Sequence, residues 1–309
     1  MGFPLPRLRS AACLPAAALL ALFAYAPAGQ ATSVDPLFDF QSTSLTDDFR
    51  QDYAGVGEAT VNIDVPYGLD DAQKYDVYLP DSPSNAPIIA MIHGGAWSGG
   101  DKEDSGVAVA KAGYWVAKGY VFVSINYRLL PKKDPLIQAA DVALAIANIQ
   151  KNAANWGADK NKLILMGSGA GGHLAALLSS NPSLASDQGA SIWSGAVILE
   201  TPALNIPVIM ENNHSAIYDT AFGTNSDFWE DSSPTNLLDH SGLPMLVVCS
   251  SESTQDTCAK ANAFSQAANN VGVKVTVSTQ ALAPSAISSQ LGVSNSYTSS
   301  VDDFIQSVL

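Results

Sequence analysis

A hydrophobic strand, a glycine-rich turn and an apolar helix follow one another in residues 163–178, LILMGSGAGGHLAALL. Gly167, Gly169 and Gly172 match the dinucleotide fingerprint G-x-G-x-x-G, in which backbone N–H groups hold a pyrophosphate at the start of a helix. The same turn also fits G-x-S-x-G with glycine in place of the central serine. Because the two patterns predict different sites, the rest of the chain has to decide between them.

Alternating strands and helices predict an α/β fold with a mostly parallel sheet that is covered by helices on both faces. Continuous apolar runs predict buried strands at 87–92, 119–127, 162–167, 195–200, 244–250 and 273–280. Helical periodicity predicts helices at 105–118, 136–154, 172–180, 258–271 and 298–308. Apolar and polar residues alternate at 59–68 and 74–80, which predicts paired strands at the start of the sheet.

Residues 201–240 are rich in Asn, Asp, Thr and Pro, and we expect them to be irregular in structure. They precede the strand at 244–250 and interrupt the regular alternation. The sequence therefore predicts an insertion or lid over the carboxyl ends of the strands, where parallel sheets bind their ligands.

The first 31 residues have the layout of a secretory signal peptide, with Arg7 and Arg9 before an apolar run that ends in small residues. Cleavage is expected after Ala31, with Ala28 as the second choice. A membrane anchor would need about 18 to 20 apolar residues, and this run is shorter. The prediction is an exported protein, periplasmic or secreted, whose mature residues 32–309 form a single domain.

The mature chain is strongly acidic, because the whole chain has 29 acidic and 15 basic residues and the leader removes two of the basic ones. Its formal charge changes from −14 to −16 (13 bases against 29 acids). Such a surface repels phosphate backbones and anionic lipids, so a nucleic-acid or membrane partner is not expected. The oligomeric state stays open.

Two cysteines remain after the leader, Cys249 and Cys258. An oxidising compartment would let them form a disulfide across a short loop, and the alternative is a pair of buried free thiols.

The segment His93-Gly94-Gly95-Ala96-Trp97 follows directly on the predicted strand 87–92. Two consecutive glycines let backbone N–H groups approach a substrate oxygen, which is how an oxyanion hole is built after such a strand. The segments VSINYRLLP (123–131) and NWGADKNKLILMG (155–167) follow along the chain, with Asp141 between them. A dinucleotide-binding domain explains neither the segment 93–97 nor the segment 123–131.

In order and spacing, these motifs resemble the α/β-hydrolase superfamily, in particular the carboxylesterase and feruloyl-esterase-like branch that includes arylformamidases and relatives of hormone-sensitive lipase. In that family the turn reads Gly-His-Ser-Ala-Gly-Gly-His, and the serine is the nucleophile. The resemblance places Gly169 at the nucleophile position. It also implies that His93, Gly94, Gly95, Trp97 and Ala170 form the oxyanion loop and pocket.

The resemblance further implies an acid and then a histidine after the elbow. Asp256 is the best match for the acid, and Glu252 is the second. Pro284 occupies the place of the histidine, and no histidine follows His240. The triad is therefore predicted to be degenerate.

These observations favour a non-hydrolytic protein, a pseudoenzyme that binds a small acyl or ester-like ligand or a protein partner. The alternative is an active esterase or lyase with a rearranged site. It would use Ser168 or a water as the attacking group, Asp256 or His173 in support, and the N–H groups of Gly95 and Ala170 as oxyanion donors. A third interpretation is a purely structural role for the sheet.

No cofactor or metal is expected. The four histidines and two mature cysteines show no ligand spacing, and His214 and His240 are predicted to be solvated. Glu200 could act as the ribose acid of a dinucleotide site, but it follows Gly172 by 28 residues, more than the usual spacing of about 20.

Overall fold

The computed structural model describes residues 43–44, 60–104 and 106–309. These all belong to one compact unit, residues 40–309, and a separate unit covers residues 1–39. The predicted leader 1–31 and its cleavage after Ala31 therefore lie outside the described residues.

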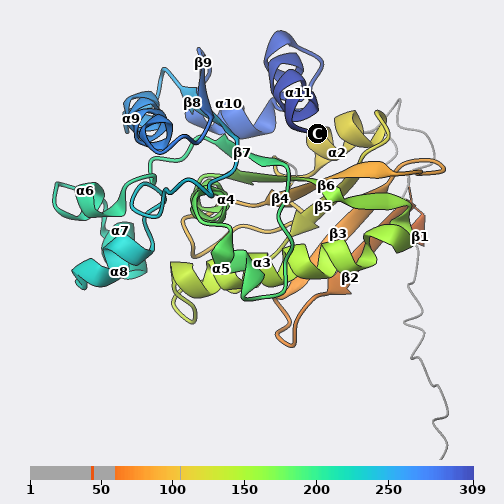
Figure 1. Cartoon of the computed structure of the whole chain (residues 1–309), viewed down its shortest axis with the longest axis horizontal. Coiled ribbons are helices and arrows are strands. Elements are labelled where there is room, and N and C mark those ends of the chain that lie inside the picture. Colours follow the sequence, from red (N-terminus) through yellow and green to blue (C-terminus); the bar gives the residue numbers. More distant parts are fainter. Residues whose placement is uncertain (1–42, 45–59, 105) are drawn as a thin grey trace, which may run out of the picture. The chain divides into compact units, whose positions relative to one another are not determined.

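A nine-stranded sheet forms the centre of the described part of the chain, in the order β1-β2-β3-β5-β4-β6-β7-β8-β9 (Figure 1). The pairs β1/β2, β2/β3 and β3/β5 are antiparallel, and the remaining pairs, from β5/β4 to β8/β9, are parallel. This confirms the prediction of a mostly parallel sheet. The strands are β1 (Thr43–Ser44), β2 (Thr60–Pro66), β3 (Lys74–Leu79), β4 (Ala86–Ile92), β5 (Val121–Ile125), β6 (Ala158–Ser168), β7 (Gly195–Leu199), β8 (Met245–Ser250) and β9 (Val275–Gln280).

Helices cover both faces of this sheet. The side chains of β4 show why, since Ile88, Ala90 and Ile92 belong to one buried cluster and Ile89 and Met91 to another. Successive side chains of a strand point to opposite faces, so an uninterrupted apolar strand needs a cover on both sides.

The first cluster contains residues of α3 (Pro135–Asn152), α4 (Ala170–Ser180), α5 (Ser183–Ser186) and α9 (Thr257–Asn270), and the short 3₁₀ helix Ala153–Trp156. The second cluster contains residues of α2 (Val109–Val116), α10 (Pro284–Ser289) and α11 (Ser296–Val308).

The insertion at 201–240 is present, but the prediction that it is irregular was wrong. It contains α6 (Ile206–Met210), α7 (Ala216–Phe222) and α8 (Ser226–Asp231), drawn in teal in Figure 1. The side chains of Asn205 and Asn225 accept hydrogen bonds from the first turns of α6 and α8. The asparagines that suggested a loop are therefore helix caps.

Two further boundaries differ from the prediction. Helix α4 begins at Ala170 and not at 172, because Gly171 and Gly172 are tolerated inside the helix where its backbone packs closely against strands. Helix α10 was not predicted at all. It is six residues long and begins with Pro284, a residue that is favoured in a first helical turn.

Asp141 on α3 joins this helix to two other segments. Its carboxylate accepts hydrogen bonds from Gln73 Nε2 at 2.8 Å, from the backbone N–H of Arg128 at 3.1 Å and from Arg128 Nε at 2.8 Å. A fourth bond comes from the second guanidinium nitrogen of Arg128. Asp141 is 2% exposed, so these partners offset the cost of burying its charge. Asp141 thus anchors α3 to the segments that contain Gln73 and Arg128.

We expect Asp141→Asn to lower the free energy of unfolding by about 2 to 4 kcal/mol, since the amide leaves Arg128 without its buried counter-charge. Urea unfolding at pH 7 measures this change. The control is Asp71→Asn, because Asp71 is exposed and makes no hydrogen bond or ion pair with the described residues. Equal stability of the two variants would contradict the anchoring role.

Candidate active site

The turn between β6 and α4 has the geometry of a sharp strand-to-helix elbow. Gly169 has φ 55° and ψ −115°, a conformation that costs an L-residue roughly 1 to 3 kcal/mol. Its N–H donates to Leu199 O at 3.0 Å, and its carbonyl accepts from the N–H of His173 at 3.0 Å. Hydrogen bonds on both sides therefore hold the strained residue in place.

Three glycines around the elbow let backbone segments approach closely. A Cβ on Gly167 would lie 2.2 Å from Gly171 O, and one on Gly171 would lie 2.3 Å from Ile92 O. A Cβ on Gly94 would lie 2.9 Å from Ser168 O. The spacing of Gly167 and Gly171 thus follows from packing between β4, β6 and α4, and it needs no phosphate to explain it.

Gly169 is different, because a side chain there would have room. The nearest atom to a Cβ at this position would be Gly94 Cα, 3.9 Å away. Steric contact therefore does not exclude a serine at Gly169, and the cost of a substitution would come from the backbone conformation.

The loop after β4 is strained over three consecutive residues. Gly95, Ala96 and Trp97 have positive φ values of 106°, 52° and 58°. The N–H groups of Ser98 and Gly99 donate to Gly95 O at 3.1 and 2.9 Å and close the turn. The N–H of Gly95 has no acceptor among the described residues, and neither does the N–H of Ala170 at the start of α4.

His93 is buried beneath this loop. Its ring stacks on Tyr127 with centroids 4.4 Å apart, and its Nδ1 lies 2.7 Å from Gly94 O, to which the protonated nitrogen donates. Burial lowers the pKa of His93. A neutral imidazole in this position orients the Gly94 peptide.

Trp97 connects the loop to α4 and to the insertion. Its Nε1 donates to His173 Nδ1 at 3.2 Å, and its ring meets Tyr218 and Phe222 of α7 edge-on at 5.6 and 5.1 Å. His173 in turn donates from Nε2 to Ser232 O at 2.8 Å, so both ring nitrogens are occupied. His173 is therefore neutral, and burial lowers its pKa to about 4.

A pocket of about 940 Å³ lies beside the elbow. It brings together six of the residues that the sequence singled out, namely Gly95, Trp97, Gly169, Ala170, Asp256 and Pro284. The insertion contributes residues from α6, α7 and the loop between them, as expected of a lid. The volume is in the usual range for a small-molecule site.

Other candidate residues do not line this pocket. Ser168 ends β6, and its carbonyl oxygen faces Gly94. Among the described residues, those that line the pocket do not include His93, Gly94, Ser168, His173 or Glu252.

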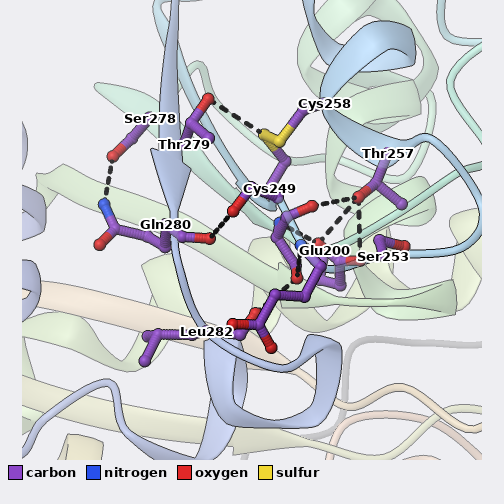
Figure 2. The surroundings of a disulfide bond; sticks show 12 residues. Glu200, Cys249, Ser253, Thr257, Cys258, Ser278, Thr279, Gln280 and Leu282 are labelled. Carbon is purple, nitrogen blue, oxygen red and sulfur yellow. Dashed lines mark hydrogen bonds between the residues drawn. A yellow bond between two sulfur atoms is a disulfide. The ribbon is translucent and has the colours of Figure 1, made fainter.

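Asp256 is an exposed residue at the start of α9, with a left-handed backbone at φ 50° and ψ 40°. It lies in the loop closed by the disulfide between Cys249 and Cys258, which the structure confirms. This disulfide joins the end of β8 to the first turn of α9 (Figure 2).

Glu200 is a pocket residue whose place at this site the sequence reasoning missed. It follows β7 with a positive φ of 42°, and its carboxylate accepts from Ser250 N at 2.6 Å and from Thr257 Oγ1 at 2.9 Å (Figure 2). Ser250 Oγ also donates to Leu282 O at 2.5 Å. An acid at the carboxyl end of a predicted parallel strand was the signal that could have indicated its location.

Two basic side chains line the pocket. His214 was predicted to be solvated, yet it lies in the lining, with Nδ1 2.7 Å from Asn212 O and Nε2 3.0 Å from Asp219 Oδ1. The hydrogen bond to Asp219 raises the pKa of His214. Lys260 of α9 is half-buried, and burial lowers its pKa. Its ammonium makes no hydrogen bond or ion pair with any residue that the structure describes.

Two negative findings apply to residues 43–44, 60–104 and 106–309. No group of three or more His, Cys, Asp or Glu side chains is arranged to hold a metal ion. No helix in this part of the chain combines the length and the apolar character needed to cross a membrane.

We expect His173 to make the protein less stable in mild acid. The unfolded chain binds the proton with a pKa near 6.5, whereas the folded chain binds it only near 4, so acidification between these values favours unfolding. The loss approaches about 3 kcal/mol at the lower value. Unfolding free energies measured from pH 7 to pH 4 should fall less steeply for His173→Gln than for the wild type. The exposed residue His240, changed to Gln, is the control, and an unchanged slope in His173→Gln would contradict a neutral buried His173.

The disulfide is expected to contribute about 2 to 3 kcal/mol to stability, the chain-entropy value for a loop of about ten residues. Cys249→Ala with Cys258→Ala should lose this amount in denaturant unfolding. A reducing agent should destabilise the wild type by the same amount and leave the double variant unchanged. Equal sensitivity of both proteins to the reducing agent would contradict the prediction.

Comparisons with known proteins agree with this geometry. The sequence model of the BD-FAE family matches residues 75–267. Kynurenine formamidase of Danio rerio is 34% identical over 117 residues, which is 38% of this chain and 38% of that protein. Esterase LipQ of Mycobacterium tuberculosis is 27% identical over 224 residues, 68% of this chain and 53% of that protein. The chain thus spans about half or less of the length of these curated relatives.

Solved structures show the fold. A truncated carbohydrate esterase from gut microbiota superimposes with a TM-score of 0.69 and 20% identity, covering 80% of this chain and 95% of that one. Esterase B of Lactobacillus rhamnosis gives a TM-score of 0.61 at 20% identity, covering 75% and 79% of the two chains. Together with the family match, they show that this chain belongs to the BD-FAE family and has an α/β-hydrolase, carboxylesterase-like fold.

Proposed function

We propose that this protein binds a small acyl or ester-like ligand in the pocket beside the elbow and does not carry out efficient serine hydrolysis. The observation that carries the proposal is the pocket lining. Gly169 has the strained elbow conformation but no side chain, and Pro284 stands in the same lining without a titratable group.

Serine hydrolysis needs a nucleophile and a base in contact with it. Loss of either from a measured triad costs on the order of 10⁶ in kcat. At the position of the nucleophile this pocket has Gly169, which lacks a side chain, and at the position of the base it has Pro284, whose ring cannot accept a proton. His173 does not replace the base, because both of its nitrogens are occupied by Trp97 and Ser232.

The parts of the site that bind a carbonyl oxygen are still present. Gly95 and Ala170 line the pocket, and their N–H groups have no acceptor in the described structure. Donors of this kind stabilise a substrate oxygen whether or not a nucleophile follows. Binding without turnover is therefore what these residues support.

A second candidate is a rearranged esterase or lyase in which a carboxylate activates water. It is favoured by Glu200, an acid with a strained backbone that lines the pocket. Ser168 fits this candidate less well, since it is not part of the described lining.

We also propose that the protein is exported to the periplasm or secreted, as its first 31 residues suggest. The disulfide between Cys249 and Cys258 supports this location, because structural disulfides persist in oxidising compartments.

The wild type should not react with a fluorophosphonate probe and should not measurably turn over p-nitrophenyl butyrate. Both follow from the missing hydroxyl at position 169. Mass spectrometry of the probe-treated protein and absorbance at neutral pH measure the two results. Turnover that Ser168→Ala abolishes would support the rearranged enzyme, and so would turnover abolished by Glu200→Gln. Either result would refute the pseudoenzyme proposal.

Gly169→Ser combined with Pro284→His should leave a folded protein. A side chain at 169 has room, so the expected cost is the backbone strain of roughly 1 to 3 kcal/mol. Circular dichroism and thermal unfolding measure the outcome. The matched control is Gly171→Ser, whose Cβ would clash with Ile92 O and which should be far less stable. Unfolding of the double variant at 25 °C would mean that one of the two positions is wrongly assigned.

A further inference from the structure

The pocket contains hydrogen-bond donors that no part of the described chain accepts. The lining residues Gly95 and Ala170 have N–H groups without an acceptor, and the ammonium of Lys260, also a lining residue, has no hydrogen-bond or ion-pair partner among the described residues. A polar donor that is partly removed from water costs free energy unless it finds an acceptor. A ligand of this pocket is therefore expected to bring acceptors.

Lys260 is distinctive in a chain with 15 basic and 29 acidic residues. The two buried lysines of the described chain, Lys102 and Lys111, both have partners. Lys102 contacts Asp64, Asp76 and Glu103, and Lys111 donates to the carbonyls of Gly106 and Ser288. Lys260 is half-buried in a pocket wall and has no such contact.

The acids of the same lining do not neutralise Lys260 by contact. Glu200 is held by the N–H of Ser250 and the hydroxyl of Thr257, which satisfy its carboxylate. Asp256 acts on Lys260 at longer range and raises its pKa against the larger lowering by burial, but the two form no ion pair within 4.0 Å. Across the lining, His214 is engaged by Asp219 and by the carbonyl of Asn212.

The open space next to Gly169 limits which chemical group of a ligand can bind beside the elbow. In a serine elbow, this space holds the nucleophile's hydroxyl beside the oxyanion donors. Here a Cβ would have no neighbour closer than 3.9 Å, so the space is open. A planar group with two oxygens can place one oxygen on the N–H groups and the other in this space.

We propose that the ligand of this pocket is a carboxylate anion rather than an intact ester. One oxygen accepts from the N–H groups of Gly95 and Ala170, and the other occupies the space that a serine side chain at position 169 would fill. Lys260 supplies the positive charge within the same pocket. This inference rests on the proposed function and adds the chemical class of the ligand.

The test compares three forms of the same compounds on the full chain at pH 7 and constant ionic strength. Sodium butyrate, hexanoate and benzoate are titrated by calorimetry, next to their methyl esters and primary amides. The carboxylates should bind at least about tenfold more tightly than either neutral form, the difference expected from a charge-assisted hydrogen bond.

Variants test the two parts of the proposal separately, namely the charge of Lys260 and the space beside Gly169. Lys260→Met should weaken carboxylate binding about tenfold or more and change ester and amide binding by a clearly smaller factor, whereas Lys260→Arg should restore most of the carboxylate affinity. Gly169→Ser should weaken carboxylates, because its hydroxyl takes the space of the second oxygen. Lys274→Met is the control, since Lys274 is exposed and outside the described lining.

The results separate the two proposals. If esters bind and carboxylates do not, or if Lys260→Met binds carboxylates as the wild type does, the carboxylate inference is wrong and the ligand-binding function stands. If none of the compounds binds to the wild type, both proposals are overturned. Steady hydrolysis of the methyl esters would refute the non-hydrolytic function independently of how tightly the acids bind.

Discussion

The contact between the backbones of β4, the elbow and α4 is the constraint on which the site depends. It exists because Gly94, Gly167 and Gly171 have no Cβ, and each would otherwise meet a carbonyl group at 2.2 to 2.9 Å. The contact brings Gly95 and Ala170 into the lining of one pocket. These glycines are needed for packing whatever the pocket binds, so the geometry of the elbow does not depend on the side chain at position 169.

A second set of interactions connects other segments that line the pocket. Glu200 joins the end of β7 to Ser250 and Thr257, and Ser250 joins the same point to Leu282, two residues before Pro284. The disulfide closes the loop between β8 and α9 from the other side. In a working triad, hydrogen bonds among acid, histidine and serine would connect these loops. Here the carboxylate of Glu200 connects two of them without reaching a nucleophile.

Much of the fold was predictable because its strands are buried on both faces, and such strands are recognisable as uninterrupted apolar runs. The disulfide between Cys249 and Cys258 was predictable because these are the two cysteines that remain after the predicted leader. The helices of the insertion were not predictable, because Asn205 and Asn225 suit a helix cap as well as a loop. The positions of Glu200 and Lys260 were missed because contacts between distant segments place them in the pocket.

The three glycines of the fingerprint are equivalent in sequence but not in structure. A Cβ on Gly167 would lie 2.2 Å from Gly171 O, and one on Gly172 would lie 3.2 and 3.3 Å from the carbonyl oxygens of Gly167 and Leu199. Gly169 has no neighbour within 3.9 Å of its missing Cβ, and only its backbone angles favour glycine. Packing therefore disfavours a side chain at Gly167 and Gly172, whereas at Gly169 only the backbone conformation does. A side chain at position 169 would therefore meet no steric obstacle in the surrounding backbone, and its presence or absence leaves the packing of the elbow unchanged.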